Sequence, residues 1–311
     1  MSRRTPRIFA ATLAVAALAL GACAERTTET PAASGSPTSA AFPVTVGSLT
    51  MEQRPEKIVS LAPTATEMLF AIGAGPQVTA VDDQSNFPAD APRSDLSGYQ
   101  PNAEAVAAKD PDLVVLSDDR NKIVDQLAAL KIPVYVTAAA QNLDDTYRQL
   151  TELGILTGNA TEAADVVQRM KDDIAKLVAE VPQRVQAPTY FHELGPELYT
   201  ATSKTFVGSI YALAGLENIA DAADPGGKSG GYPQLSQEVI VKANPDFVFL
   251  SDVKCCQQSA ATVKARSGWS GINAVRNDQV VELDDDIASR WGPRVVDLLR
   301  AIVDATSKAA E

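Results

Sequence analysis

Ser229 and His192 are the residues whose types first suggest catalysis. Ser229 lies in Gly227-Lys228-Ser229-Gly230-Gly231, which matches the G-x-S-x-G pattern of serine hydrolases. A nucleophilic serine needs a base, and His192 is the only histidine of the chain. That motif works on a sharp turn between a strand and a helix, whereas Pro225 before it and Pro233 after it indicate a loop. The sequence therefore argues against an enzyme, and a secreted hydrolase is kept as an alternative.

Acidic residues could also suggest a metal site at Asp284-Asp285-Asp286. The spacing of acids and glycine that an EF-hand calcium loop requires is absent, so we interpret this run as a solvated turn. With one histidine in the chain, a zinc or manganese site built from several histidines is disfavoured. We predict neither a metal site nor a cofactor.

The N-terminal segment predicts export from the cytoplasm. Three arginines precede the apolar run from Ile8 to Leu20, as in a secretory signal peptide over residues 1–22. Leu20-Gly21-Ala22-Cys23 resembles the lipobox of bacterial lipoproteins, which implies that Cys23 becomes the lipidated first residue. Residues 23–43, rich in Thr, Ser, Ala and Pro, then form a flexible linker. We expect a protein that is lipid-anchored to the cell membrane on its extracytoplasmic side.

The two remaining cysteines, Cys255 and Cys256, are adjacent. Outside the cytoplasm spare thiols usually pair, so we expect a vicinal disulfide. Adjacent Cα atoms lie only about 3.8 Å apart across a trans peptide, below the usual disulfide range. Free thiols or an intermolecular pair are therefore the alternatives.

One pattern occurs twice in the chain and indicates the elements that position these residues. Glu104 and Glu238 each stand seven residues before a Pro-Asp pair, and an apolar strand ending in Ser-Asp follows both times. Proline ends the preceding helix. The strands Leu113 to Leu116 and Phe247 to Leu250 are apolar on both faces, which favours parallel strands covered by helices on both sides. The repeat predicts two similar α/β lobes with separate cores.

Strands alternate with helices on both sides of a long helical region. The sequence thus predicts an α/β fold with two Rossmann-like lobes, each with a parallel sheet, bridged by a single long α-helix. The predicted domains after the linker are an N-terminal lobe, a connecting helix and a C-terminal lobe, at residues 44–142, 143–182 and 183–311. Gly158-Asn159 interrupts the helical region, and Pro182 ends it.

The paired motif, the lipobox and Ser60-Leu-Ala-Pro-Thr-Ala-Thr-Glu67 after the first strand give the chain a family resemblance. Over residues 56–308 it resembles the substrate-binding lipoproteins of ABC importers for ferric siderophores, haem and cobalamin. The resemblance implies a ligand cleft between lobes, little hinge bending, and delivery to an ABC permease dimer. It also implies that Glu104 and Glu238 contact arginines of the permease. In addition, paired charges of this kind supply orientation and on-rate more than affinity.

Loops at the carboxyl ends of parallel strands line the crevice of open α/β sheets. We expect the ligand-binding residues there, and for any single one a helix cap or a solvated loop is the alternative. The candidates are Asp82, Asp83, Asp118, Asp119, Arg120, His192, Glu193, Tyr232, Asp252, Arg290 and Trp291.

The formal net charge is −12, and removal of residues 1–22 takes away three arginines and no acid. Such a chain is not suited to nucleic acid. The charge favours a neutral or cationic ligand, so we expect a ferric siderophore or related metal chelate, with cobalamin (a corrinoid) as the alternative. Haem ligated by His192 and an anchored scaffold that binds only protein are weaker hypotheses. We expect a monomer.

Overall fold

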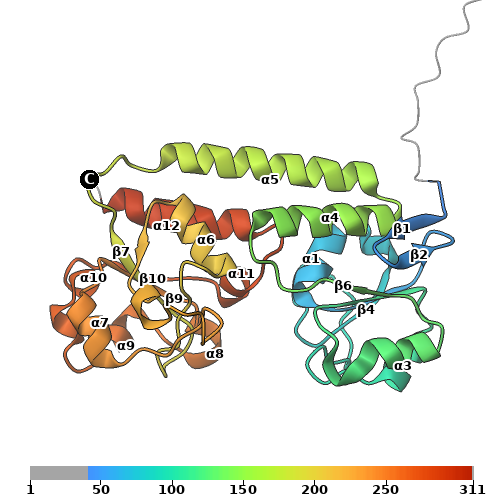
Figure 1. Cartoon of the computed structure of the whole chain (residues 1–311), viewed down its shortest axis with the longest axis horizontal. Coiled ribbons are helices and arrows are strands. Elements are labelled where there is room, and N and C mark those ends of the chain that lie inside the picture. The colour runs from blue at the N-terminus through green and yellow to red at the C-terminus, as the bar shows by residue number, and fades with distance from the viewer. Residues whose placement is uncertain (1–40, 310–311) are drawn as a thin grey trace, which may run out of the picture. The chain divides into compact units, whose positions relative to one another are not determined.

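The computed structural model describes residues 41–309 of the 311-residue chain. A short antiparallel hairpin comes first, with strands β1 (Val44–Val46) and β2 (Leu49–Met51). The strands beyond it form two four-stranded sheets in which all neighbouring strands are parallel, and helices surround both sheets (Figure 1). The predicted α/β fold with two lobes is therefore confirmed.

The N-terminal sheet has the strand order β4-β3-β5-β6. Its strands are β3 (Ile58–Leu61), β4 (Val78–Val81), β5 (Leu113–Leu116) and β6 (Val134–Val136). All residues of β3 and β5 are buried, because helices cover both faces of the sheet. One face packs on α1 (Pro63–Ala71) and α4 (Leu143–Thr157), and the other on α2 (Ala103–Ala107) and α3 (Ile123–Ala129).

The C-terminal sheet has the order β10-β9-β7-β8. Its strands are β7 (Thr189–Glu193), β8 (Glu217–Asn218), β9 (Phe247–Leu250) and β10 (Val280–Glu282). One face packs on α6 (Phe206–Leu213) and α12 (Val295–Lys308), and the other on α7 (Gln237–Ala243), α9 (Ala260–Lys264) and α10 (Asn273–Arg276). Two short helices, α8 (Val253–Cys256) and α11 (Asp285–Ser289), follow β9 and β10.

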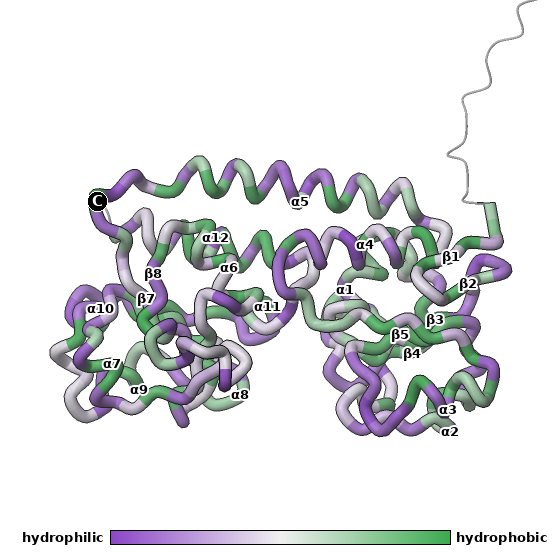
Figure 2. Tube along the Cα trace, in the orientation of Figure 1, coloured by the Kyte–Doolittle hydropathy of each residue, from purple (hydrophilic) through white to green (hydrophobic). Residues whose placement is uncertain are grey.

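The long helical region predicted at 143–182 contains two helices. Gly158 ends α4 with a φ of 73°, a left-handed conformation that glycine adopts without steric cost. After this break, α5 (Ala160–Glu180) leads to the C-terminal lobe. It packs on α4 and on α12, and Figure 2 shows apolar residues recurring along it. The connection between the lobes is thus α5 alone, whereas α4 belongs to the N-terminal lobe.

We call the sheet face covered by α1 and α4, and the face of the other sheet covered by α6 and α12, the inner faces. Side chains from both inner faces join in one buried apolar cluster. Met68 of α1, Leu153 of α4, Leu177 of α5 and Phe249 of β9 all belong to it. The outer faces have clusters of their own, one in each lobe. The expectation of separate cores is therefore wrong for the inner faces, because α4, α5 and α12 pack on one another and continue the core from lobe to lobe.

Several segments differ from the sequence-based expectations. Glu197 to Thr200, which follows β7, forms no strand and makes only an isolated bridge between Tyr199 and Gln234. The short strand β8 and the helices α8 to α11 were not predicted. These elements have two to five residues, too few for an apolar period to develop.

Candidate functional site

A pocket of about 300 Å³ lies where residues from both lobes meet, and we call it the interlobe pocket. The N-terminal lobe contributes the start of α1 and the loops after β4 and β5, and the C-terminal lobe contributes α11 and the residues after it. The lining residues are Ala62, Pro63, Thr64, Gln84, Ser117, Asp286, Ser289, Arg290 and Trp291. The N-terminal lobe thus presents the carboxyl ends of three parallel strands, as the sheet topology predicts.

Local sequence explains how the N-terminal wall forms. Pro63 occupies the first turn of α1, where its fixed φ suits a helix start and its missing N–H costs nothing. The loop after β4 crosses the end of β3 so closely that a Cβ added at Gly98 would lie 2.3 Å from the carbonyl oxygen of Leu61. Only glycine fits there, because any side chain would collide with the end of β3.

Arg290 lines the interlobe pocket, but its guanidinium is already engaged within the protein. Its Nη1 donates to Glu67 and Asn86 at 2.8 and 2.9 Å, and its Nη2 donates to Asp286 and the Gln84 carbonyl at 2.8 and 3.1 Å. The side chain is 9% exposed. Arg290 therefore shapes the pocket and has little capacity left for a ligand.

Trp291, the next residue, also lines the pocket and packs against the buried apolar cluster that the two lobes share. Its indole Nε1 donates to Gln149 Oε1 at 3.0 Å, and its carbonyl accepts from Thr146 at 2.9 Å. Both partners belong to α4 of the N-terminal lobe. These bonds fix the orientation of the ring, so that Trp291 is the aromatic residue of the pocket lining.

The predicted acids of the N-terminal lobe mostly serve the loops themselves. Asp82 is buried and accepts from the Ser85 N–H at 2.8 Å, and burial raises the pKa of its carboxyl. Asp119 accepts from the Val124 N–H at the start of α3. Asp118 pairs with Arg120 at 2.8 Å, next to the pocket residue Ser117. Asp83, which precedes the pocket residue Gln84, and Arg120 are exposed.

His192 and Glu193 do not line the interlobe pocket, because strand β7 continues through both and buries them completely. His192 Nδ1 is 2.8 Å from the Tyr211 hydroxyl, and burial lowers the pKa of the imidazole to about 4. Glu193 forms a two-bond ion pair with Arg266, 2.6 Å between Oε2 and Nη1. Both side chains are thus part of the C-terminal core.

Asp252 is also fully buried, directly after β9. Within the described residues, neither of its carboxyl oxygens has a hydrogen-bond partner. Burial, and then the charge of Glu193, raise the pKa of Asp252 to about 7. A protonated Asp252 would donate to Glu193, which explains how two acids share this buried position.

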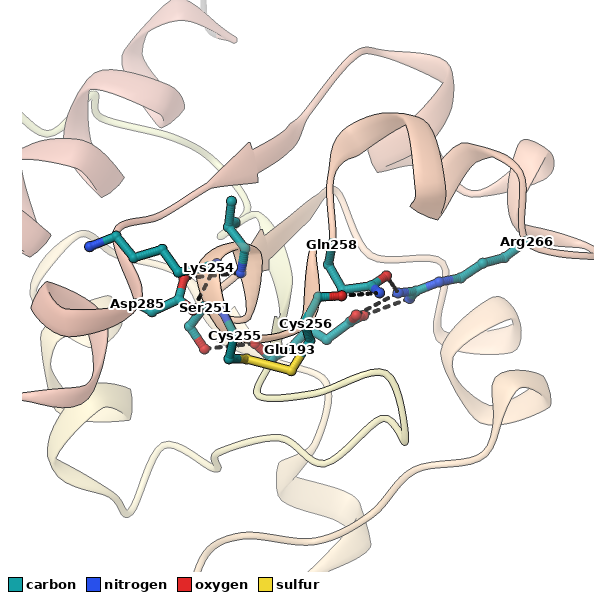
Figure 3. The surroundings of a disulfide bond; sticks show 9 residues. Glu193, Ser251, Lys254, Cys255, Cys256, Gln258, Arg266 and Asp285 are labelled. Atoms are coloured by element: carbon teal, nitrogen blue, oxygen red, sulfur yellow. Dashed lines mark hydrogen bonds and ion pairs between the residues drawn. A yellow bond between two sulfur atoms is a disulfide. The ribbon is translucent and has the colours of Figure 1, made fainter. Parts of the chain in front are cut away.

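Cys255 and Cys256 are joined by a disulfide on the exposed turn α8 (Figure 3). The N–H groups of Val253, Lys254 and Cys255 all donate to the carboxylate of Asp285, at 2.9 to 3.0 Å. Figure 3 shows Lys254 and Asp285 on one side of the disulfide and the Glu193–Arg266 pair on the other. The disulfide turn is therefore bonded to α11, which leads into the pocket.

The interpretation of Asp284-Asp285-Asp286 as a solvated turn is wrong. Asp284 caps α11, accepting from the Asp286 and Ile287 N–H groups, and Asp285 accepts the amides of α8. Asp286 pairs with Lys254 and with Arg290, both at 2.8 Å. Within residues 41–309, no group of three or more His, Cys, Asp and Glu side chains is arranged to hold a metal ion.

The segment around Ser229 is a loop wrapped around Asp224. The Asp224 carboxylate accepts from the Ser229 and Gly231 N–H groups at 3.0 and 2.9 Å, and these backbone donors lower its pKa. The loop has neither a strand before it nor a helix directly after it, as a nucleophile elbow would require. Tyr232, which follows this loop, is 48% exposed and does not line the interlobe pocket.

Glu104 and Glu238 occupy equivalent positions in the two lobes. Each is the second residue of its helix, α2 or α7, after a side-chain N-cap by Asn102 or Ser236. Both glutamates are exposed. The hydrogen bond with Ser236 lowers the pKa of Glu238. The repeat in the sequence thus gives two exposed carboxylates with the same local geometry.

A larger cavity, of about 640 Å³, lies elsewhere in the C-terminal lobe, beside Thr189 and Phe247. These residues begin β7 and β9, so this cavity is at the amino ends of the strands, where open α/β sheets do not usually bind ligands. Its carboxylate, Asp246, is bonded to Thr189 and Asn273. We therefore take the interlobe pocket as the candidate site.

Sequence reasoning did not assign Thr64 or Ser289 to the site. Thr64 lies inside the Ser-Leu-Ala-Pro-Thr motif, which could have pointed to it. Gln84 belongs to the polar loop from Asp82 to Asn86 after β4, which the sequence predicts at the crevice, and it lines the pocket. Ser289 ends α11, a helix with no periodic signal in the sequence.

Cys23 lies outside the described residues. Between residues 41 and 309, no helix has both the length and the hydropathy to cross a membrane.

Known proteins resemble this chain over most of its length. The family model for periplasmic binding proteins matches residues 58–287. An uncharacterized ABC transporter substrate-binding lipoprotein of Bacillus subtilis, YvrC, is 30% identical and covers 82% of this chain and 83% of its own. A cobalamin-binding protein of Halobacterium salinarum is 32% identical, with 85% and 74% covered.

Solved structures show the same fold. A possible iron-binding, periplasmic solute-binding protein of Staphylococcus epidermidis has a TM-score of 0.69 and 26% identity, with 83% of this chain and 100% of that chain covered. The vitamin B12-binding protein BtuF of Vibrio cholerae has a TM-score of 0.67 and 24% identity, covering 83% and 98%. The family match extends through both lobes and the helix between them, and the chain belongs to the periplasmic binding protein family, whose members are substrate-binding transport proteins.

Proposed function

We propose that this protein is the extracytoplasmic solute-binding component of an ABC importer, and that it binds a large metal chelate at the interlobe pocket. The observation that carries the proposal is the pocket itself, which both lobes build from loops at strand ends and from Trp291. Concave sites that combine an aromatic surface with a few polar groups are typical ligand sites. A lipid on Cys23 would hold the protein at the membrane.

A corrinoid is the ligand that we favour. A relative named as a cobalamin-binding protein is 32% identical over 277 residues, and others named as vitamin B12-binding proteins are 26–29% identical. The pocket offers an indole and small hydroxyl side chains rather than a free cationic cluster, which suits a large ring with amide groups. A corrinoid is larger than 300 Å³, so only one edge of it would enter.

A ferric siderophore is the second candidate, and the charge of the protein supports it. The net charge of −12 and the engagement of Arg290 by Glu67 and Asp286 favour a neutral or cationic hydroxamate chelate over an anionic catecholate. Haem gains no support from His192, which is fully buried beside Tyr211 and cannot reach a ligand in the pocket.

A thermal-shift panel tests the ligand class. Residues 24–311 are heated with cyanocobalamin, a ferric hydroxamate siderophore, a ferric catecholate siderophore or haemin. A ligand at 100 times its Kd stabilises the folded state by about 2.7 kcal/mol, so we expect a clear rise in Tm with cyanocobalamin. A rise only with the hydroxamate would select the second candidate. No rise with any of the four would contradict the proposal.

Trp291→Ala then tests the site with the ligand that the panel selects. If the indole stacks on the ligand, the substitution should weaken binding by about 1–3 kcal/mol in calorimetry. Trp291→Phe keeps an aromatic surface and is the matched control, with a smaller expected loss. Affinity unchanged in folded Trp291→Ala would remove this residue from the ligand site.

Delivery to the importer would use both lobes. We propose that the exposed Glu104 and Glu238 contact basic residues on a permease dimer, one carboxylate for each subunit, while the protein itself acts as a monomer. Their equivalent positions on α2 and α7 support this arrangement, because a two-fold symmetric partner presents the same surface twice.

A further inference from the structure

A buried carboxylate of the N-terminal lobe is shared by two arginines of the C-terminal lobe. Glu67 belongs to α1 and is 3% exposed. Its Oε1 accepts from Arg290 Nη1 at 2.8 Å, and its Oε2 accepts from Arg294 Nε at 2.9 Å. Arg294 Nη2 makes a further bond to Glu67. The two arginines stand 223 and 227 residues after the glutamate, so these bonds join the lobes directly.

Further bonds extend this contact to the loop after β4. Asn86 accepts from Arg290 at 2.9 Å and donates to Asp286 at 2.9 Å. The guanidinium of Arg294 lies over the ring of Phe87, 4.3 Å from its centre. Residues from two separate parts of the N-terminal lobe, α1 and this loop, therefore contact both arginines.

The segment that carries the arginines is held equally firmly within its own lobe. Asp286 also pairs with Lys254 at 2.8 Å, and Asp285 accepts three amides of the disulfide turn α8. Figure 3 shows Lys254 within that turn and Asp285 beside it. A displacement of Arg290 would thus have to break bonds to both lobes or move the C-terminal lobe with it.

The charges of this cluster are balanced and largely shielded from water. Glu67 and Asp286 offset Arg290 and Arg294, and the two arginine side chains are only 9% and 17% exposed. Breaking one partner of a buried pair leaves the other charge uncompensated, which is more costly than losing an exposed pair. The planar guanidinium fork also bonds a carboxylate in a fixed direction, whereas apolar contacts allow sliding.

We propose that Glu67 is a positioning residue that, through Arg290 and Arg294, fixes the angle between the two lobes. The interlobe pocket is bordered by the same cluster, so its width follows from this angle. The angle also sets the spacing of Glu104 and Glu238. That last consequence rests on the proposed function, because a fixed spacing matters when one rigid body must meet two permease subunits at once.

Electron spin resonance can report a change of this angle as a change in the distance between two labels, one on each lobe. The measurement needs neither a ligand nor an importer. Nitroxide labels are attached to a keto amino acid introduced at exposed Asp125 on α3 and exposed Lys242 on α7, which leaves the native cysteines intact. We expect one narrow distance distribution for the native chain. Glu67→Gln keeps the shape of the side chain and removes its charge, so we expect a shifted or broadened distribution with a second population.

Glu180→Gln is the matched control, because it makes the same chemical change at an exposed position of α5 and should leave the distribution unchanged. Arg290→Lys keeps the charge but loses the fork, and we expect an intermediate broadening. If Glu67→Gln fails to fold, Arg290→Lys is the deciding variant, because it cannot keep the bonds from Nη1 to Glu67 and from Nη2 to Asp286 together.

A folded Glu67→Gln protein with the native distribution would overturn the proposal, as would an unchanged distribution in Arg290→Lys if only that variant folds. The result does not depend on the proposed function. A broadened distribution in Glu67→Gln would uphold the positioning role even if the native protein served no importer, and that second result would contradict the transport role alone.

Discussion

Asp252 and His192 show how two buried residues of one lobe respond to pH in opposite senses. Burial and the neighbouring Glu193 raise the pKa of Asp252 from 3.8 to about 7. Burial lowers the pKa of His192 from 6.5 to about 4. Between about pH 4 and pH 7, the number of protons bound by each group therefore differs between the folded and the unfolded chain.

The signs follow from proton binding in each state. Folded Asp252 binds more protons than the unfolded chain, so its contribution to stability is complete below about pH 4 and is lost as the pH rises toward 7. Folded His192 binds fewer protons, so its contribution is complete above pH 6.5 and is lost as the pH falls toward 4. The two effects oppose each other in the native protein.

Replacing Asp252 with Asn should reveal this opposition. Asparagine stays neutral and can donate to Glu193 as the protonated acid would, so Asp252→Asn removes the loss of stability at high pH. We expect the free energy of unfolding of the variant, relative to the native protein, to rise between pH 4.5 and pH 7.5. Urea unfolding at several pH values measures it. Asp304→Asn, exposed on α12, is the control, and a pH-independent difference for Asp252→Asn would contradict the raised pKa.

At the scale of elements, α2 and α7 are short helices that present one exposed glutamate each. Asn102 and Ser236 cap them, and Glu104 and Glu238 follow in the second helical position, where a negative charge is favourable near the helix start. Neither glutamate lines the interlobe pocket. Ligand binding and docking should therefore be separable by mutation.

Glu104→Lys and Glu238→Lys together should abolish uptake and leave ligand affinity unchanged. Like charge against basic permease residues costs more than the loss of attraction alone, so the double variant should transport less than either single variant. In reconstituted transport the defect should lessen as ionic strength rises, because salt screens exposed charges. Glu162→Lys with Glu180→Lys, both exposed on α5, makes the same charge change elsewhere. Normal transport by the first pair would refute the docking role.

For the whole molecule, the sequence predicted the architecture because its signals are local and repeated. The apolar strands Leu113 to Leu116 and Phe247 to Leu250, each after a Pro-Asp pair, indicated parallel sheets, and both sheets formed. The break at Gly158 also separated two helices as its position suggested. Periodicity and turn residues suffice for such elements.

The candidate site was harder to predict because it depends on contacts between distant residues. Asn86 bonds Asp286 across 200 positions, and Arg290 bonds Glu67 across 223, and no local pattern indicates either pair. His192 and Glu193 are expected among the loops at the carboxyl ends of the strands, but both are the last residues of strand β7. Each has a partner from a distant part of the lobe, buried Tyr211 for His192 and half-buried Arg266 for Glu193, and this bond makes the burial possible.

The proposed lipid anchor concerns the whole chain and would depend on one residue, Cys23. A basic start, the apolar run from Ile8 to Leu20 and the sequence Leu20-Gly21-Ala22 precede it. Cys23→Ala removes the only thiol that could carry the lipid at this position. We expect the variant in the soluble fraction after cell lysis, with the native protein in the membrane fraction. Ser34→Ala, in the same polar segment, is the control and should stay with the membrane. A Cys23→Ala protein that sediments with membranes and resists a mild salt wash would contradict lipid anchoring, since nothing in the acidic folded part favours an anionic membrane surface.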